Sequence, residues 1–247
     1  MKWKSLLLVL VVCFLRGAVA WSLSLSDLLT QSRVYLRDTN TTRPRFSDSQ
    51  LTFFFNNGQR EIAARSWCLI ASSAITLQSG TTEYSLPSDC IAPLRVTVNH
   101  NALAERPFSF LDEAGRAWIN EPGGTPREYY VRTDSSVVAN VSRESIGFHP
   151  VSTFTASAII QYAQQPSDLV SASDIPFSGN NRLYPYHQSL AFYAAFSGYM
   201  ALGMKEEAML YFQLYTASAG DLDGNNSSRT LFNPNFRGVK PAPAKEP

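Results

Sequence analysis

The sequence predicts an α+β fold: a helical bundle, made of N-terminal helices plus a C-terminal helical hairpin, with an inserted antiparallel β-sheet or small sandwich. Near both ends of the chain, apolar residues recur at three- and four-residue steps, which indicates amphipathic helices. Between these regions, short β-branched and aromatic runs are bounded by turn residues, which is typical of strands. Helices and strands do not alternate, so a doubly wound nucleotide-binding fold is not favoured.

These patterns divide the chain into five segments. They are a signal-peptide-like leader (1–20), an N-terminal helical part (21–73), a β region (74–165), a connector with the C-terminal helical hairpin (166–220) and a flexible tail (221–247). The chain has 247 residues and 45% of them are hydrophobic, so it can bury a sizeable core in one or two domains.

The first twenty residues have the pattern of a secretory leader. Lys2 and Lys4 precede an apolar run from Leu6 to Leu15, and Ala18-Val19-Ala20 supplies the small residues expected before a signal-peptidase cut. The run is shorter than the roughly 20 apolar residues of a membrane-spanning helix. A cleaved leader is therefore favoured over a retained anchor, and we expect no membrane contact after its removal.

Two helices are expected after the leader. Ser26 and Asp27 are expected to cap the first helix, and the stretch from Asp38 to Pro44 to end it. Ser47 is expected to cap the second helix, in which Leu51 is a core residue. Polar residues later in this helix are assigned mainly to its solvated face, namely Asn56, Asn57, Gln59, Arg60 and Glu61.

The β region is expected to contain six strand segments. They are Ile75-Thr76-Leu77, Glu83-Tyr84-Ser85-Leu86, Leu94-Arg95-Val96-Thr97-Val98, Glu128-Tyr129-Tyr130-Val131, Ser145-Ile146-Gly147-Phe148 and Ala158-Ile159-Ile160-Gln161-Tyr162. After a connector, Leu183 to Leu202 and Lys205 to Ala219 are predicted as a helical hairpin broken at Gly203, with Phe212 in its core.

Composition and motifs do not favour an enzyme. The formal charge is +1, so no overall basic field indicates nucleic-acid or anionic-lipid binding. His100, His149 and His187 have no partners at metal-ligand spacing, and the sequence carries neither a Gly-x-Ser-x-Gly elbow nor a phosphate-binding loop. We therefore predict no catalytic residue, no cofactor and no metal, and we assign the acidic pair Asp112-Glu113 to a solvated turn.

Two cysteines remain once the leader is removed. Cys68 lies in a predicted helical segment and Cys90 follows a predicted strand, so the sequence does not fix their separation. A disulfide formed in an oxidising compartment and two buried thiols are both open alternatives.

One local basic cluster is the candidate binding feature of the sequence. Its five members, all in the first helical part, are Arg33, Arg37, Arg43, Arg45 and Arg60. These arginines are possible contacts to a DNA channel or to an acidic partner, and a solvated helix face is the alternative interpretation.

Several short motifs, taken in order, resemble those of the head-to-tail adaptor (connector, or tail tubular) proteins of tailed bacteriophages. The resemblance covers about residues 24 to 220. The motifs are Leu36-Arg37-Asp38, Phe46-Ser47-Asp48-Ser49-Gln50-Leu51, Asn57-Gly58-Gln59-Arg60-Glu61-Ile62-Ala63, Tyr84-Ser85-Leu86-Pro87-Ser88-Asp89, Gly124-Thr125-Pro126-Arg127-Glu128-Tyr129-Tyr130, Gly147-Phe148-His149-Pro150 and Ile160-Gln161-Tyr162-Ala163-Gln164-Gln165-Pro166.

The resemblance implies a structural subunit without catalysis. Such a subunit forms a homo-oligomeric ring under the portal protein, binds tail proteins and continues the channel through which DNA passes without sequence recognition. It assembles in the host cytoplasm and ends at the head-tail junction of the virion. The signal-like leader departs from this family, so an exported or periplasmic binding protein with a β-sandwich recognition region is the alternative.

Overall fold

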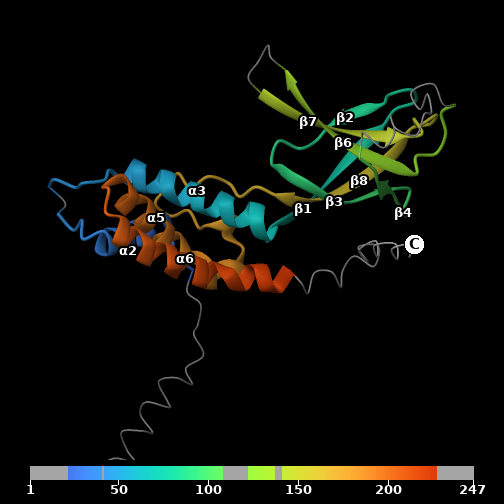
Figure 1. The fold of residues 1–247 in the computed structure, drawn as a ribbon. Helices are drawn as coiled ribbons and strands as arrows, with labels where there is room; N and C mark the ends of the chain where they lie inside the picture. The colour runs from blue at the N-terminus through green and yellow to red at the C-terminus, as the bar shows by residue number, and fades with distance from the viewer. Residues whose placement is uncertain (1–21, 41, 108–121, 137–140, 227–247) are drawn as a thin grey trace, which may run out of the picture. The chain divides into compact units, whose positions relative to one another are not determined.

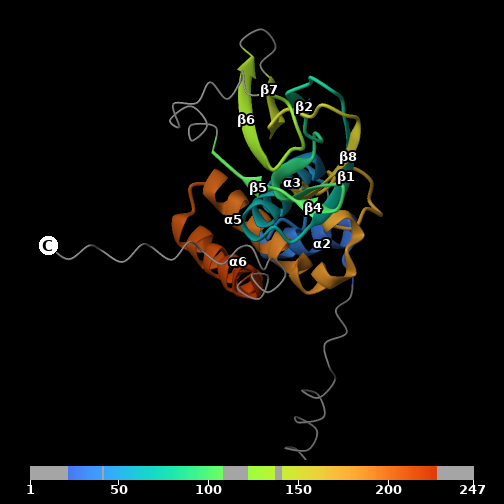
Figure 2. The same cartoon turned by 90° about the vertical axis from the view of Figure 1, so that its right-hand side faces the viewer.

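The computed structural model describes residues 22–40, 42–107, 122–136 and 141–226. Two compact units are formed, a helical unit within residues 1–61 and 167–247 and a β unit within residues 62–166. Figures 1 and 2 show the helices and strands from two directions. The α+β class predicted from the sequence is confirmed. The leader, the pair Asp112-Glu113 and residues 227–247 lie outside the described residues.

Four α-helices and two short 3-10 helices are present in the described part of the chain. They are α2 (Leu25–Tyr35), α3 (Asp48–Ser66), η2 (Phe177–Gly179), η3 (Asn181–Tyr186), α5 (His187–Ala201) and α6 (Lys205–Asn226). The last helix extends beyond Gly220, where the sequence pattern placed the start of a flexible tail.

The capping residues explain where α2 and α3 begin. Ser24 is the N-cap of α2: its Oγ accepts the N–H of Asp27, and the Asp27 carboxylate accepts the N–H of Ser24 at 2.9 Å. The prediction of Ser26 and Asp27 as caps was therefore wrong, because Asp27 is the third helical residue of a capping box. The Ser47 cap is confirmed, since its Oγ accepts the Gln50 N–H and Gln50 Oε1 accepts the Ser47 N–H.

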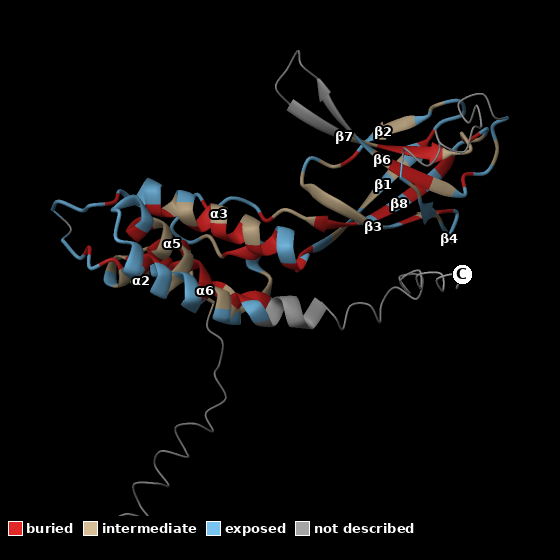
Figure 3. Cartoon of the chain, in the orientation of Figure 1, coloured by how far each residue is buried: buried red, intermediate tan, exposed pale blue. Residues whose placement is uncertain are grey.

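The helical unit has a core of aliphatic and aromatic side chains (Figure 3). Leu51 is fully buried, as predicted. Helix α5 packs against α2 and α6, and a Cβ added at Gly198 of α5 would lie 2.6 Å from Leu36 Cδ2, so this close approach requires glycine. The prediction of Phe212 as a core residue was wrong, because α6 instead turns Ala208 and Tyr215 inward and leaves Phe212 39% exposed.

The described residues of the β unit form eight strands in two four-stranded sheets. The strands are β1 (Ile70–Leu77), β2 (Glu83–Ser85), β3 (Cys90–Val98), β4 (Asn101–Ala102), β5 (Ala104–Glu105), β6 (Glu128–Ser136), β7 (Val141–His149) and β8 (Ala156–Gln164). Their orders are β1-β8-β3-β4 and β2-β7-β6-β5. Each of the six predicted segments corresponds to one of the longer strands or to β2.

Two details of the β unit differ from the sequence-based expectation. Strand β5 runs parallel to β6, so the second sheet is mixed and not purely antiparallel. Strand β1 begins at Ile70, where its antiparallel partner is Ala163 of β8, and the segment 70–74 has no β-branched run that would have indicated it. The two-residue strands β4 and β5 carry no periodic signal.

Buried side chains from both sheets form one core. Along β8, alternate residues Ala156, Ala158, Ile160 and Tyr162 are buried, as expected for a strand with one face turned inward. The second sheet contributes Tyr129, Ile146 and Phe148 to the same cluster. The red segments of β6 and β8 in Figure 3 follow this core.

Gly147 in β7 allows an aromatic ring to cover the strand. Its cross-strand partner is Tyr130, and a Cβ at position 147 would overlap the Tyr130 ring. The Tyr130 hydroxyl reaches Glu83 Oε1 of β2 at 3.2 Å, so the ring is held across the strand between them. The packing of Tyr130 therefore explains why the Gly147-Phe148-His149-Pro150 motif begins with glycine.

Candidate functional site

The connection between α2 and α3 is the candidate functional site. We name residues 36–46 the basic loop, because Arg37, Arg43 and Arg45 all lie on it with exposed side chains. In Figure 1 this loop joins the two blue helices at one end of the helical unit.

A buried carboxylate fixes the path of the basic loop. Asp38 is 3% exposed and accepts the backbone N–H groups of Arg45 at 2.8 Å and Phe46 at 3.1 Å. Its Oδ2 also accepts a hydrogen bond from Nη1 of Arg33 at 3.1 Å. Because a buried carboxylate must be paired and hydrogen-bonded to be tolerated, Asp38 ties the two ends of the loop together. It does not cap a helix.

Arg33 supports the loop from within. Its Nη2 donates to Asp48 Oδ1 at 2.6 Å and to the carbonyl oxygen of Phe46 at 3.1 Å, and the side chain is 20% exposed. Arg33 therefore does not fit the alternative interpretation of a solvated helix face. We conclude that the Arg33 guanidinium orders the loop and is not available to bind a partner.

The rest of the loop is also held by local hydrogen bonds. Asn40 Oδ1 accepts the N–H groups of Thr42 at 3.0 Å and Arg43 at 3.3 Å, which is an Asx-type turn. Arg37 has φ of 52°, and its N–H donates to the Val34 carbonyl where α2 ends. The backbone is thus defined at each of the three arginines that face solvent.

The electrostatics of the basic loop are unbalanced. Within the described residues, no acidic side chain forms a salt bridge with Arg37, Arg43 or Arg45. Three such guanidinium groups within nine residues suit a partner that presents carboxylates or phosphates, because the planar guanidinium binds both bidentately.

Arg60 does not belong to this group. It lies about three turns along α3 and forms an ion pair with Asp168, with distances of 2.5 and 2.7 Å from Nη2 to the two carboxylate oxygens. The structure therefore brings Arg33, Arg37, Arg43 and Arg45 to one connection and places Arg60 elsewhere.

Two buried amides beside Arg60 were missed by the sequence-based reasoning. Asn56 exchanges hydrogen bonds with the backbone N–H and carbonyl of Leu169, at 2.8 and 3.2 Å. Gln59 is fully buried, donates to the Ser167 carbonyl at 2.8 Å and accepts the Phe177 N–H at 3.1 Å. Their assignment to the solvated face was wrong, because this face of α3 binds the 167–177 segment.

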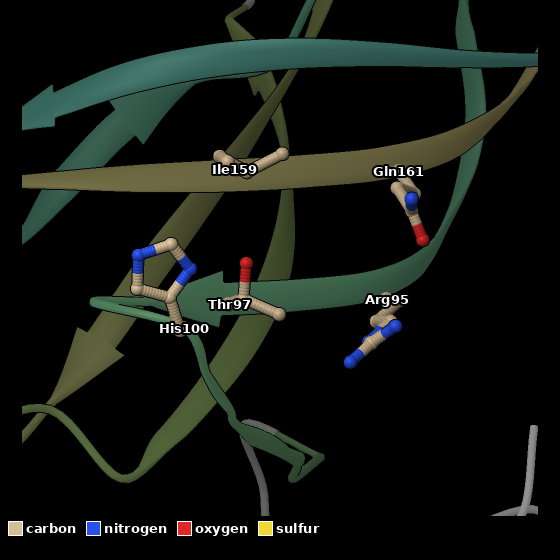
Figure 4. A pocket seen from close by; sticks show the side chains of 5 residues that line it. All are labelled: Arg95, Thr97, His100, Ile159 and Gln161. Carbon is tan, nitrogen blue, oxygen red and sulfur yellow. The ribbon is translucent and has the colours of Figure 1, made fainter.

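A shallow depression lies on the outer face of the first sheet. It measures about 180 Å³ and is lined by Arg95 and Thr97 of β3, His100 of the following turn, and Ile159 and Gln161 of β8 (Figure 4). The searched residues contain no group of three His, Cys, Asp or Glu side chains that could hold a metal ion.

His187 is a buried residue at the start of α5. Its Nδ1 accepts the N–H of Leu23 at 3.1 Å, and its ring contacts those of Phe177 and Tyr184. Nε2 has no hydrogen-bond partner among the described residues. Burial lowers the pKa of His187 to about 4, so the imidazole is neutral near pH 7.

This burial predicts an acid-dependent loss of stability. The unfolded chain protonates His187 near pH 6.5 but the folded chain does so near pH 4, so the free energy of unfolding falls through this interval by as much as about 3 kcal/mol. Urea unfolding followed by circular dichroism at several pH values measures the fall. His187→Gln should flatten it, whereas His100→Gln should not. An unchanged profile in His187→Gln would contradict the assignment.

Cys68 and Cys90, the two cysteines among the described residues, form no disulfide. Helix α3 ends at Ser66, so the helical assignment of Cys68 was wrong. Cys90 follows strand β2, as predicted, and is itself the first residue of β3. Burial raises the pKa of the Cys90 thiol to about 11, which keeps it protonated near pH 7 and poorly nucleophilic.

Comparison with known families gives one match. A family model described as SU10 adaptor protein matches residues 23–238, which include all described residues except Ser22. A search of curated proteins found no match. None of the helices in the searched part of the chain combines the length and apolar character that a membrane crossing requires.

Proposed function

The chain belongs to the SU10 adaptor protein family of phage head-to-tail adaptors, and from this premise we propose that it forms a ring between portal and tail that continues the DNA channel. The family identifies it as a structural phage protein and implies portal and tail proteins as partners. The ring, the passage of DNA without sequence recognition and assembly in the host cytoplasm are parts of the proposal.

The extent of the family match is the observation that carries this proposal. It covers residues 23–238, and therefore elements of both the helical unit and the β unit. The match begins at residue 23, and it gives no support to an exported binding protein with a β-sandwich recognition region. A structural adaptor role also implies that the chain is not an enzyme.

The two units suggest a division of tasks. We propose that the helices form a bundle, with α5 and α6 as its hairpin, and that this bundle packs around the ring while the β unit contacts partners. The basic loop is the proposed contact to a channel or to an acidic partner through Arg37, Arg43 and Arg45. Arg33 supports that loop, and the exposed ion pair of Arg60 is a second possible contact.

The experiment that tests the adaptor role is mass spectrometry of density-purified particles from a culture that expresses the gene. Peptides of the protein should copurify with portal and tail proteins. Recovery only in exported fractions, with Trp21 as the first residue, would overturn the proposal and favour the exported binding protein.

Replacement of the loop arginines tests their role. The variant Arg37→Gln, Arg43→Gln, Arg45→Gln should retain the melting midpoint, because these side chains are exposed, and should reduce incorporation into particles at least tenfold. Arg182→Gln removes another exposed cation of the helical unit and is the matched control. Normal incorporation of the triple variant would exclude the basic loop as an essential contact.

A further inference from the structure

We propose that the outer face of α6 is the surface through which one copy of this chain binds a second copy. We name this surface the α6 stripe, defined by Leu210, Leu214 and Ala217 with Met209 beside them. The inference rests on the proposed ring and identifies the helix that forms its subunit contact.

Helix α6 carries apolar residues on two opposite sides. Ala208, Tyr215 and Ala219 are buried, and Tyr215 packs against Tyr193 of α5 with ring centroids 5.1 Å apart. Leu210 and Leu214 follow at i and i+4 on the other side, where they are 54% and 40% exposed. Packing within the helical unit covers only one of these two apolar sides, and the second side is left for a partner.

The α6 stripe lacks charge. No charged residue occurs from Ala208 to Gly220, and the charged residues of α6 lie near its two ends, namely Lys205, Glu206, Glu207, Asp221 and Asp223. This arrangement of an apolar, charge-free centre with charged residues at its edge matches the usual composition of a protein interface. It does not match the surface that a nucleic acid or a strongly acidic partner would require.

The apolar area fits a subunit contact. Three large side chains of the α6 stripe are 40–57% exposed, namely Met209, Leu210 and Leu214. At about 200 Å² for each such residue, they present roughly 300 Å² of mostly apolar surface. A standard interface buries about 800 Å² per partner, and somewhat more than half of that area is apolar. The stripe therefore supplies roughly two thirds of the apolar area of one such contact.

A second copy is the occupant that these observations favour. An uncharged stripe offers no electrostatic means to select a different protein, whereas identical subunits are the commonest partners of such surfaces. The same unit also exposes Phe53 of α3, which is 59% exposed and lies on a different helix. Head-to-tail rings need two different surfaces on each subunit, and α3 with Phe53 is a candidate for the second.

The test compares the full-length chain with the double variant Leu210→Lys, Leu214→Lys. Lysine at 210 lies four residues after Glu206, an arrangement that supports the helix, so the fold should be retained. Native mass spectrometry and sedimentation velocity over a concentration series should show oligomers of the wild type and at least a 100-fold weaker self-association of the variant. Val170→Lys is the matched control, because Val170 is 83% exposed on the same unit, and its self-association should stay within about twofold.

Each other outcome overturns the inference. If the double variant oligomerises like the wild type, the ring uses another surface and the proposed function is unaffected. If another part of the same chain covers the stripe, the variant lowers the melting midpoint without changing the oligomeric state. A wild type that stays monomeric but binds a purified portal or tail protein through the stripe would exclude the second copy as occupant and leave the adaptor role intact. If it is also absent from particles, both proposals fail.

Discussion

Asp38→Ala is expected to lower the free energy of unfolding of the helical unit by about 3–5 kcal/mol. The carboxylate is buried and accepts hydrogen bonds from Arg33 and from the backbone of Arg45 and Phe46. Its removal leaves a guanidinium that is 20% exposed with one partner fewer, together with two backbone N–H groups without an acceptor. Urea unfolding monitored by circular dichroism measures the change.

Asp48→Ala provides the matched control, because Asp48 pairs with the same guanidinium. Asp48 lies 2.6 Å from Arg33 Nη2, but its side chain is 71% exposed, so its removal should cost less than about 1 kcal/mol. Each variant removes one carboxylate from Arg33, so a difference between the two losses of stability reports the effect of burial and not that of the lost charge. Equal losses in the two variants would show that Asp38 does not anchor the basic loop.

The loss at Asp38 also has a functional consequence. The loop displays Arg37, Arg43 and Arg45 because its backbone is fixed between two helices. If the adaptor uses these cations, Asp38→Ala should reduce particle incorporation at temperatures at which this variant is still folded, as is expected for the triple arginine variant. The buried carboxylate is thus a positioning residue for the proposed contact.

Local sequence patterns predicted the strands better than the capping and buried polar residues. The segments around Ile146 and Ile160 contain β-branched and aromatic residues and were placed correctly. The pair Ser24 and Asp27 carried a readable capping-box spacing, but the neighbouring Ser26 offered a competing cap. Which of two neighbouring serines caps a helix depends on which backbone N–H groups lack a partner in the fold, and the sequence does not show this.

Long-range contacts account for the larger errors. Asn56 and Gln59 are polar residues on a helix, for which a solvated face is the normal expectation. Gln59 is buried by a segment that begins 108 residues later in the chain, and helical periodicity carries no information about that segment. For Arg33, its two acidic partners are close in sequence, but only the folded loop brings both to one guanidinium.

The buried amide of Gln59 leads to the second large prediction. Gln59→Ala is expected to cost about 2–5 kcal/mol, because the buried Phe177 N–H and the Ser167 carbonyl each lose their hydrogen bond to the amide and a cavity remains. Arg60→Ala changes the neighbouring residue, which binds the same segment through an ion pair with exposed partners. It should cost less than about 1 kcal/mol.

Hydrogen exchange gives this prediction a local measure. In Gln59→Ala the Phe177 amide should exchange faster than in the wild type, because its acceptor is gone, whereas in Arg60→Ala its rate should be nearly unchanged. If both variants lose the same stability, the ion pair and not the buried amide holds the 167–177 segment to α3. If only Gln59→Ala is destabilised, Arg60 can be substituted without unfolding the unit. A loss of particle incorporation in Arg60→Ala would then report on assembly alone.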